Sequence, residues 1–279
     1  MTTKSSTEQP VPILLAGMHR SGTSMLADIL TNAGLQTGCH RDPNGESVLF
    51  LQWNQWLLLQ AGCRWDHPSH WHPWINPLKA TAAAQLKQTL QEPYARHAFF
   101  GKRFHAPDFF TYTHPWGWKD PRNTLTFPIW KHVFPQARAL IMTRHGVDVA
   151  ASLQQRATAE WQRWRPAKGP AAQRLITGSA RCLSLDAAFS LWQEYQEAAI
   201  CLQSQYPADI LVIPYEKLLA EPQIHLPRIF TFCQLPEPSH LDRQLSLETA
   251  RAFAYQKSPE LAAFAAAHAP QLRQYGYEP

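Results

Sequence analysis

Near the N-terminus, eight residues have the composition and spacing of an anion-binding loop. Gly17 and Gly22 stand five positions apart, and the stretch that begins at Gly17 is Gly-Met-His-Arg-Ser-Gly-Thr-Ser. A glycine-bounded turn of this kind directs successive backbone N–H groups toward an anion at the positive end of a helix. Arg20, inside the loop, adds a planar guanidinium that binds oxyanions through two parallel hydrogen bonds. The segment therefore predicts a site for an anionic ligand.

The spacing of the two glycines matches the ATP-binding motif G-x-x-x-x-G-K-[ST], with one difference. Thr23 stands where that motif has lysine. The loop thus keeps the backbone cradle and lacks the cation that contacts the transferred phosphates of ATP, which disfavours a kinase. The alternative interpretation is an ordinary glycine turn between a strand and a helix.

The residues on both sides of the loop predict the elements that position it. Residues 11–16 form a short apolar run typical of a buried parallel strand. After the loop, apolar residues recur at helical spacing from Met25 to Ala33, and Gly34 follows where helices tend to end. Further strands are predicted at 116–119, 139–143 and 210–213, and helices at 46–60, 79–91, 146–155, 183–205, 225–233 and 259–268. This alternation indicates an α/β, P-loop-like three-layer fold with a central parallel sheet flanked by helices.

No repeat or low-complexity linker divides the 279 residues. We therefore expect a single α/β domain over 1–279 with a flexible polar tail at 1–10. Two stretches match no regular element and are predicted to be inserted loops, 62–77 and 156–178. The first is rich in Trp, His and Pro, and the second is rich in Arg.

The composition excludes several classes of protein. Hydrophobic residues make up 45% of the chain and charged residues 17%, so the chain buries a large core and is not intrinsically disordered. The net charge of +5 is a mild basic excess that is compatible with an anionic ligand. Apolar runs such as 11–17 are far shorter than the ~20 residues of a membrane span, and residues 1–9 are too polar for a signal peptide. The five scattered cysteines predict the cytoplasm rather than a disulfide framework.

Four segments resemble those of a known family, in the family's order. The glycine loop (17–24) resembles the 5′-phosphosulfate-binding loop of the sulfotransferase superfamily, in particular its bacterial branch with the sequence Gly-Met-His-Arg-Ser-Gly-Thr-Ser. Residues 118–122 are similar to the family's Lys-Asp-Pro-Arg segment. Residues 143–153 are similar to its 3′-phosphate-binding segment, and residues 213–222 are similar to its Tyr-Glu-x-Leu segment. The resemblance covers most of the chain, from residue 13 to about residue 235. Gly146 and Pro214 depart from the Pro and Arg that are common at these positions.

The resemblance implies transfer of a sulfuryl group from 3′-phosphoadenosine-5′-phosphosulfate (PAPS) to an acceptor hydroxyl. PAPS carries negative charge at two ends, so the protein needs two anion sites. The loop residues expected at the 5′ end are His19, Arg20, Ser21, Gly22, Thr23 and Ser24. Arg144 and Ser152 are expected at the 3′-phosphate, with a salt bridge and a helix surface as their respective alternatives. Asp148 is expected in the first turn of a helix, where the helix dipole favours a carboxylate.

Further residues are candidates for the chemical step. Lys119, together with Arg20, would stabilise negative charge on the leaving oxygen, and Glu46 would serve as general base. The stretch Asn-Gly-Glu-Ser around Glu46 resembles the family's Gly-x-x-Glu-Ser region with two residues missing. Alternatively, Glu46 opens a helix, which would lower its pKa, and Lys119 pairs with Asp120. Arg122 would bind acceptor or donor, or pair with Asp120.

Aromatic and basic stretches are candidates for the acceptor site. Trp65, Trp71 and Trp74 would offer flat faces to a sugar or an aromatic acceptor, or would anchor a surface loop. The Arg and Trp residues of 156–168 would form a lid over the donor or contact an acidic acceptor. No recognition motif accompanies them, so no nucleic acid is expected as a partner. Near the C-terminus, residues 257–258 (Lys-Ser) would close over the adenosine end of PAPS.

We therefore predict a cytoplasmic, bacterial-type sulfotransferase with PAPS as donor and a glycan or another hydroxylated small molecule as acceptor. No metal is expected, because a sulfuryl group carries less charge than a phosphoryl group. His19 and His114 are the other candidate bases. The alternatives are an ATP-dependent P-loop kinase and a catalytically inactive nucleotide-binding protein that keeps the anion sites without the base.

Overall fold

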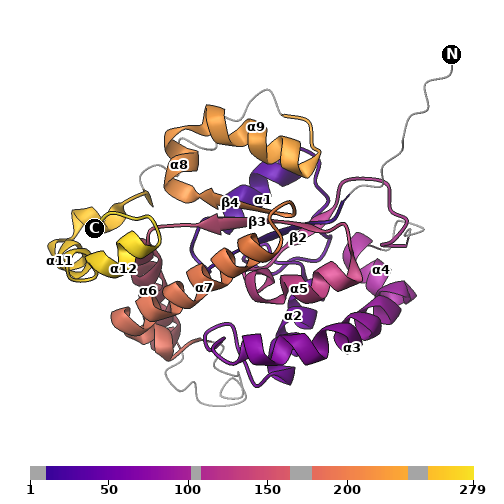
Figure 1. Ribbon diagram of the computed structural model, residues 1–279, viewed down its shortest axis with the longest axis horizontal. Helices are drawn as coiled ribbons and strands as arrows, with labels where there is room; N and C mark the ends of the chain where they lie inside the picture. Colours follow the sequence, from indigo (N-terminus) through magenta and orange to yellow (C-terminus); the bar gives the residue numbers. More distant parts are fainter. Residues whose placement is uncertain (1–10, 102–107, 164–177, 238–250) are drawn as a thin grey trace.

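The centre of the molecule is a sheet of four parallel strands in the spatial order β2-β1-β3-β4 (Figure 1). The strands of the computed structural model are β1 (Ile13–Gly17), β2 (Gly117–Lys119), β3 (Arg138–Thr143) and β4 (Ile210–Pro214). The register pairs Leu15 with Lys119 and Gly17 with Met142. Because all four strands are parallel, their carboxyl ends lie at one edge of the sheet, where α/β proteins bind ligands.

The structure describes residues 11–101, 108–163, 178–237 and 251–279. The first helices are α1 (Thr23–Asn32), α2 (Val48–Gln60), α3 (Trp71–Gln91), α4 (Pro93–Phe100), α5 (Asn123–Val133) and α6 (Gly146–Arg163). The later ones are η2 (Arg181–Leu183), α7 (Leu185–Gln205), α8 (Tyr215–Ala220), α9 (Pro222–Cys233), η4 (Ala254–Lys257), α11 (Pro259–Ala267) and α12 (Ala269–Gln274). None of these described helices combines the length and apolar composition needed to cross a membrane.

Helices cover both faces of the sheet, as the alternation of side chains along β1 requires. Ile13 and Leu15 point to one face and pack with α1, α8 and α9, whereas Leu14 and Ala16 point to the other and pack with α2, α3, α5 and α7 (Figure 1). The prediction of a three-layer α/β fold with a central parallel sheet is confirmed. Since β1 leads into α1 on the first face and β3 leads into α6 on the second, a crevice opens between their carboxyl ends.

Much of the tryptophan of this chain lies in the core. Trp116 and Trp118 pack with Phe50, whose ring stacks on Trp118 with centroids 3.8 Å apart. The fully buried side chains also include Trp71, Trp130 and Trp192. Hydrophobic burial therefore accounts for much of the tryptophan in the composition.

The two predicted inserted loops are partly helical, which corrects the prediction. In 62–77, helix α3 begins at Trp71, because Pro73 falls in its first turn, where proline needs no N–H donor, and the helix also accommodates Pro77. In 156–178, helix α6 continues to Arg163, because Leu153 and Ala157 extend its buried face by another turn. Residues 164–177 and the predicted tail 1–10 lie outside the described residues.

Candidate active site

The glycine loop connects the carboxyl end of β1 to the amino end of α1, and packing determines its two glycines. Gly17 has a φ of +125°, and a Cβ there would lie 2.2 Å from the Met142 carbonyl oxygen of β3. Gly22, the N-cap of α1, has a φ of +97°, and a Cβ there would lie 2.5 Å from the Tyr215 ring of α8. Only glycine fits both positions. The close approach of β3 and α8 to the loop depends on these residues.

Hydrogen bonds on its inner side hold the curve of the loop. Ser21 is buried, and its Oγ donates to the Met18 carbonyl oxygen at 2.6 Å. The Gly17 N–H donates to Thr124 Oγ1 of α5 at 2.8 Å. The Ser21 hydroxyl is therefore turned into the loop, and it shapes the loop from inside.

The outer side of the loop faces a cavity of about 1200 Å³. Gly22, Thr23 and Ser24 line this cavity at the first turn of α1, where backbone amides have no acceptor within the helix. Arg20, in a left-handed conformation with a φ of +72°, also lines it. Amides at a helix N-terminus beside a guanidinium form an oxyanion site.

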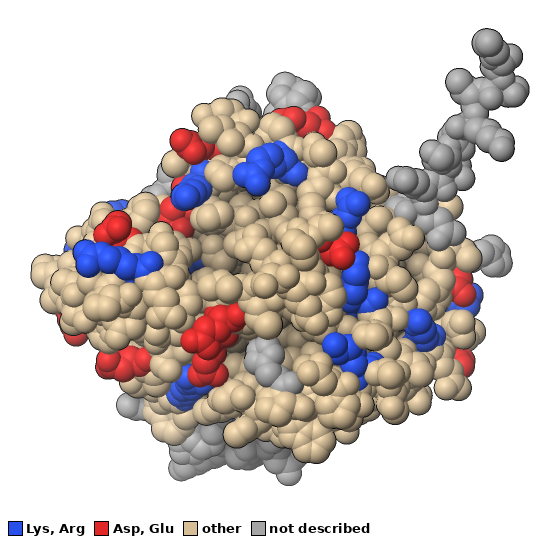
Figure 2. Space-filling model, viewed as in Figure 1, with Lys and Arg blue, Asp and Glu red and all other residues tan. Residues whose placement is uncertain are grey.

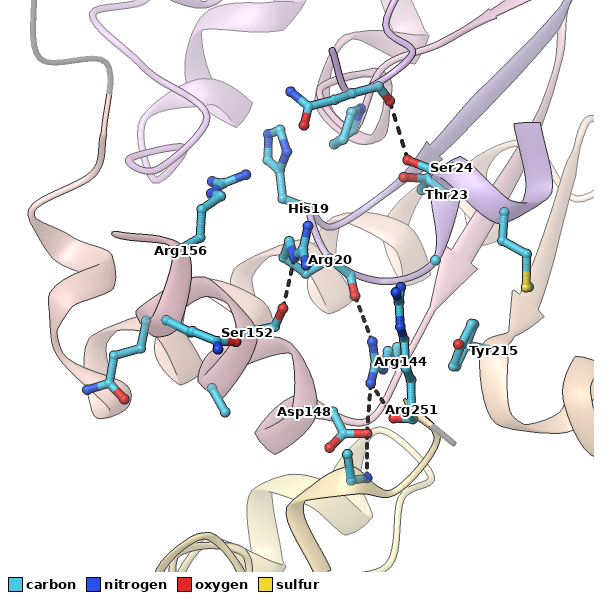
Figure 3. A pocket seen from close by; sticks show the side chains of 18 of the residues that line it. His19, Arg20, Thr23, Ser24, Arg144, Asp148, Ser152, Arg156, Tyr215 and Arg251 are labelled. Atoms are coloured by element: carbon cyan, nitrogen blue, oxygen red, sulfur yellow. Dashed lines mark hydrogen bonds and ion pairs between the residues drawn. The ribbon is translucent and has the colours of Figure 1, made fainter. Parts of the chain in front are cut away.

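Arg20 also joins the loop to the second predicted anion site. Its Nε donates to Ser152 Oγ on α6 at 2.8 Å, and its carbonyl oxygen accepts from Arg144 Nη1 at 3.2 Å (Figure 3). Arg144 directly follows β3, and Ser152 lies two turns along α6. The structure thus brings Arg20, Arg144 and Ser152 together on one cavity.

Arg144 is held on several sides by protein groups. Its Nη2 donates to Asp148 Oδ2 at 3.1 Å and to the Arg251 carbonyl oxygen. Its guanidinium carbon lies 4.9 Å from the centroid of the Tyr215 ring. The salt bridge predicted as the alternative for Arg144 is therefore present, and it fixes this cation in orientation at the cavity wall.

Asp148 anchors a C-terminal segment to the site. As predicted, Asp148 stands in the first turn of a helix, α6. Its carboxylate accepts the N–H groups of Tyr255 at 2.8 Å and Ala254 at 3.3 Å, both in η4. Of the predicted 257–258 pair, Ser258 follows η4 and lines the cavity. The carboxylate therefore positions the segment that carries Ser258.

Arg251, which the sequence motifs did not predict, lines the same cavity. Figure 3 shows its side chain running beside Arg144 toward the glycine loop. No recognisable motif surrounds this residue, and it lies 107 positions from Arg144 in sequence. A lone arginine in a segment without a motif gives no signal in a single sequence.

Glu46 also lines the cavity, and it lies between two cations. Its side chain is 2% exposed, with Oε1 3.2 Å from Lys119 Nζ and Oε2 3.1 Å from Arg122 Nη1. Lys119 Nζ also donates to the Asn44 carbonyl oxygen at 2.9 Å. Lys119 therefore pairs with Glu46 rather than with its sequence neighbour.

The local structure around Glu46 differs from the predicted helix start. Helix α2 begins at Val48, and the Glu46 N–H donates to Asp42 Oδ1 at 2.7 Å in the preceding turn. Burial, followed by the charge of Asp120, raises the pKa of Glu46 against the opposing effect of the two cations. The expectation of a pKa lowered by a helix N-terminus is wrong.

A buried hydrogen-bond network supports this pair. Arg122 Nη1 donates to Asp120 Oδ1 at 2.8 Å, and Asp120 Oδ2 accepts from Asn54 Nδ2 at 2.9 Å. Asn54 is completely buried, and its Oδ1 accepts from Thr126 Oγ1 at 2.8 Å and Trp130 Nε1 at 2.7 Å. Arg122 is therefore fixed by carboxylates on both sides, whereas its predicted contact with substrate stays a prediction.

A model described as the sulfotransferase family matches residues 12–239. The chain belongs to the sulfotransferase family. A search of curated proteins finds no significant match.

Several solved structures are similar to this sulfotransferase. The sulfotransferase domain from the Synechococcus PCC 7002 olefin synthase is 17% identical, with 88% of this chain and 79% of that chain covered and a TM-score of 0.47. The sulfotransferase domain from the curacin biosynthetic pathway is 16% identical, with 85% and 77% covered and a TM-score of 0.46. A sulfotransferase from Mycobacterium tuberculosis is 16% identical, with 86% and 72% covered and a TM-score of 0.43.

His19 stands inside the loop of this sulfotransferase as a buried imidazole that lines the cavity. Burial, followed by the charges of Arg122, Arg156, Lys119 and Arg20, lowers its pKa well below the usual value. The His19 and Trp65 rings form a T-shaped contact with centroids 4.6 Å apart. His19 is therefore neutral at pH 7 and sits where several cations converge.

The structure does not bring the other predicted aromatic residues to the cavity. Trp71 is 1% exposed, and its Nε1 donates to the Leu125 carbonyl oxygen at 2.7 Å, so it is a core residue. Trp74 lies on the exposed side of α3, because the helix that begins at Trp71 turns it outward. Trp65 packs behind His19, and His114 lies apart from the lining residues.

Outside this cavity, the visible charges of the sulfotransferase are dispersed. Figure 2 shows Lys and Arg interspersed with Asp and Glu over a largely uncharged face. The cavity brings together a denser set of charges, with the cations of Arg20, Lys119, Arg144, Arg156 and Arg251 beside the carboxylates of Asp28, Glu46, Asp148 and Glu260. Among the described residues, no group of three His, Cys, Asp or Glu side chains has the arrangement of a metal site.

Proposed function

We propose that this sulfotransferase transfers the sulfuryl group of PAPS to a hydroxyl of a glycan or of another hydroxylated small molecule. The observation that carries the proposal is one cavity lined by three functional groups: the glycine loop, the Arg144–Ser152 pair and the Glu46–Lys119 pair. Two cationic sites match the two charged ends of PAPS. The carboxylate and the ammonium supply a base and a counter-charge for the transfer.

The donor is assigned to the two anion sites. The amides of Gly22, Thr23 and Ser24 and the guanidinium of Arg20 would hold the 5′-phosphosulfate, with His19 and Ser21 shaping the loop. Arg144 and Ser152 would hold the 3′-phosphate. The contact between Arg20 and Ser152 supports this assignment, because it places the two sites within the reach of one nucleotide.

Lys119 is the cation best placed to change partners. Its Nζ donates to the Asn44 carbonyl oxygen and to Glu46, and an ammonium on a flexible stem reorients readily toward a new anion. Arg122 stays beside Glu46, because Asp120 holds it. When Lys119 turns toward the donor oxygens, Glu46 loses one stabilising cation, which raises its affinity for a proton.

The transfer then requires one substitution at sulfur and one proton transfer. The acceptor oxygen forms a new S–O bond while the bond from sulfur to the bridging oxygen breaks. The electron pair of that bond remains on the 5′-phosphate, where Lys119 and Arg20 stabilise the charge. Glu46 takes the hydroxyl proton, and the products are a sulfate ester and 3′,5′-adenosine bisphosphate (PAP).

Two alternatives fit the site less well. A P-loop kinase would use lysine at the position of Thr23. An inactive nucleotide-binding protein would have no need of the Glu46–Lys119 pair, whose burial carries a desolvation penalty. We keep the cytoplasm as the proposed location on the ground of the scattered cysteines.

The test is formation of PAP from PAPS in the presence of EDTA, with a panel of glycans and phenols as acceptors and water as the basal acceptor. We expect acceptor-dependent PAP formation that falls when Arg144 or Ser152 is replaced by alanine. Ser152→Ala is the safer variant, because Arg144 also has structural contacts. Phosphoryl transfer from ATP with Mg²⁺, without turnover of PAPS, would overturn the proposal.

A further inference from the structure

Arg156 lines the cavity without belonging to either donor site. It lies on α6 one turn after Ser152, so both side chains are on the same side of the helix. Figure 3 shows Arg156 pointing toward His19 from the α6 side. The guanidinium carbon lies 5.3 Å from the centroid of the Trp65 ring.

Trp65 gives this guanidinium a fixed support. The Trp65 carbonyl oxygen accepts from Tyr195 Oη at 3.0 Å, and the Trp65 and His19 rings pack at an interplanar angle of 67°. Tyr195 is itself completely buried. An arginine placed over an indole face keeps its N–H donors free for a planar oxyanion. Trp65 thus acts by holding Arg156 rather than by contacting a ligand in the cavity itself.

Among the described ion pairs of the cavity, the charge of Arg156 is more weakly compensated than the charges of Lys119 and Arg144. Its carboxylate contact is Glu160, one turn further along α6, at 3.7 Å, and both side chains are partly exposed. Lys119 and Arg144, by comparison, have buried carboxylates at 3.2 and 3.1 Å. A distant, solvent-exposed partner screens a cation only weakly and is readily exchanged for a ligand.

Arg156 also lies near the end of the cavity where the sulfuryl group is transferred. Arg156, Lys119 and His19 all line the cavity, and the charges of both cations lower the pKa of the His19 ring, so both lie near this loop residue. Near Arg156, helix α6 adds Gln155, Thr158 and Gln162 to the lining. These side chains offer hydrogen bonds to a hydroxylated molecule and little apolar surface.

We propose that Arg156, supported by Trp65, binds an anionic oxyacid group of the acceptor, so that the natural acceptor is a hydroxylated small molecule that also carries a carboxylate, sulfate or phosphate. This inference rests on the proposed function, because it assumes that PAPS fills the other two anion sites. The cavity of about 1200 Å³ exceeds the 300–1,000 Å³ typical of single-ligand pockets, which leaves room for donor and acceptor together.

The test compares matched neutral and anionic probes on protein loaded with PAP. Calorimetry would measure binding of methyl β-D-glucopyranoside against its 6-carboxylate, and of phenol against 4-hydroxybenzoate and 4-hydroxyphenyl sulfate. We expect the anionic member of at least one pair to bind ~10-fold or more tightly than the neutral one, as for a hydrogen-bonded charged group. Arg156→Gln removes this preference and leaves PAP binding unchanged within about twofold.

Arg163→Gln is the matched control, because Arg163 carries the same charge at the exposed end of the same helix. It should retain both the preference and PAP binding. Equal binding of neutral and anionic probes to the native protein, or no binding of any anionic probe, would overturn the inference. So would a loss of PAP affinity in Arg156→Gln as large as that in Ser152→Ala. If PAP itself fails to bind the native protein, it is the proposed function that fails.

Discussion

Replacing Glu46 by Gln separates its proposed chemical role from a role in stability. Glu46 is 2% exposed, and burial together with Asp120 raises its pKa in spite of Lys119 and Arg122. The site therefore favours the neutral form relative to water, and one unit of such a shift corresponds to about 1.4 kcal/mol. Glu46→Gln mimics the neutral form, so we expect the free energy of unfolding to fall by less than about 1 kcal/mol, or to rise.

The catalytic effect of Glu46→Gln should be far larger. Loss of a general base lowers turnover by roughly 100-fold or more, whereas PAP affinity should stay within about threefold of that of the native protein, because Glu46 contacts neither proposed phosphate site. The assay is the initial rate of PAP formation from PAPS, with PAP binding and urea unfolding measured on the same preparation. Turnover within threefold of native, with PAP binding intact, would refute the assignment of Glu46 as base.

The pH profile gives an independent readout of the same carboxyl. The rate should fall as pH drops through the pKa of Glu46, at a higher pH than for an exposed glutamate, and Glu46→Gln should lose this limb. The contribution of Glu46 to the stability of the native protein changes with pH in the opposite direction to the rate. Because the folded-state pKa is raised, the native protein loses stability as pH rises from the ordinary Glu range through the raised value. An acid limb at the ordinary Glu value would contradict the burial argument.

Three further predictions follow from the structure. Gly22→Ala should lower the free energy of unfolding in urea by about 2 kcal/mol more than Gly34→Ala, and it should abolish the PAP-induced Tm shift. Both glycines have a positive φ, but only at Gly22 would a Cβ lie 2.5 Å from the Tyr215 ring. Equal losses of stability in the two variants would contradict this. Asn54→Ala should lower the free energy of unfolding by about 3 kcal/mol or more, since it removes the hydrogen-bond partner of the buried Asp120 Oδ2 and Trp130 Nε1 atoms, and a loss below 1 kcal/mol would argue against the network. Burial lowers the pKa of His145, so Tm should fall as pH drops below the ordinary His value, and His145→Gln should flatten that slope; an unchanged slope would exclude His145 as its source.

The local parts of the site were predictable from the sequence. The glycine loop, the strand before it and the helix after it form one continuous segment, so glycine spacing and apolar periodicity were sufficient to place them. The parallel sheet followed from the alternation of short apolar runs with helical patterns. Arg144 and Ser152 were expected at a second anion site because of the resemblance to the sulfotransferase family, and both line the same cavity as the loop.

The long-range parts of the site were not predictable. Glu46 contacts Arg122 across 76 positions, so its buried environment and raised pKa depend on tertiary packing that no local pattern encodes. The prolines around Trp71 predicted an aromatic loop at this position. The prediction was wrong because these prolines are compatible with the first turns of α3. The expectation of one domain over the whole chain stays a prediction.

Binding of PAP to the native chain tests the central claim most directly. Isothermal titration in excess EDTA should give saturable binding of PAP that Ser152→Ala weakens by several-fold, because PAP carries both phosphates assigned to the cavity. ATP under the same conditions should bind more weakly, since it lacks the 3′-phosphate. Binding of ATP with Mg²⁺ and no binding of PAP would contradict the account.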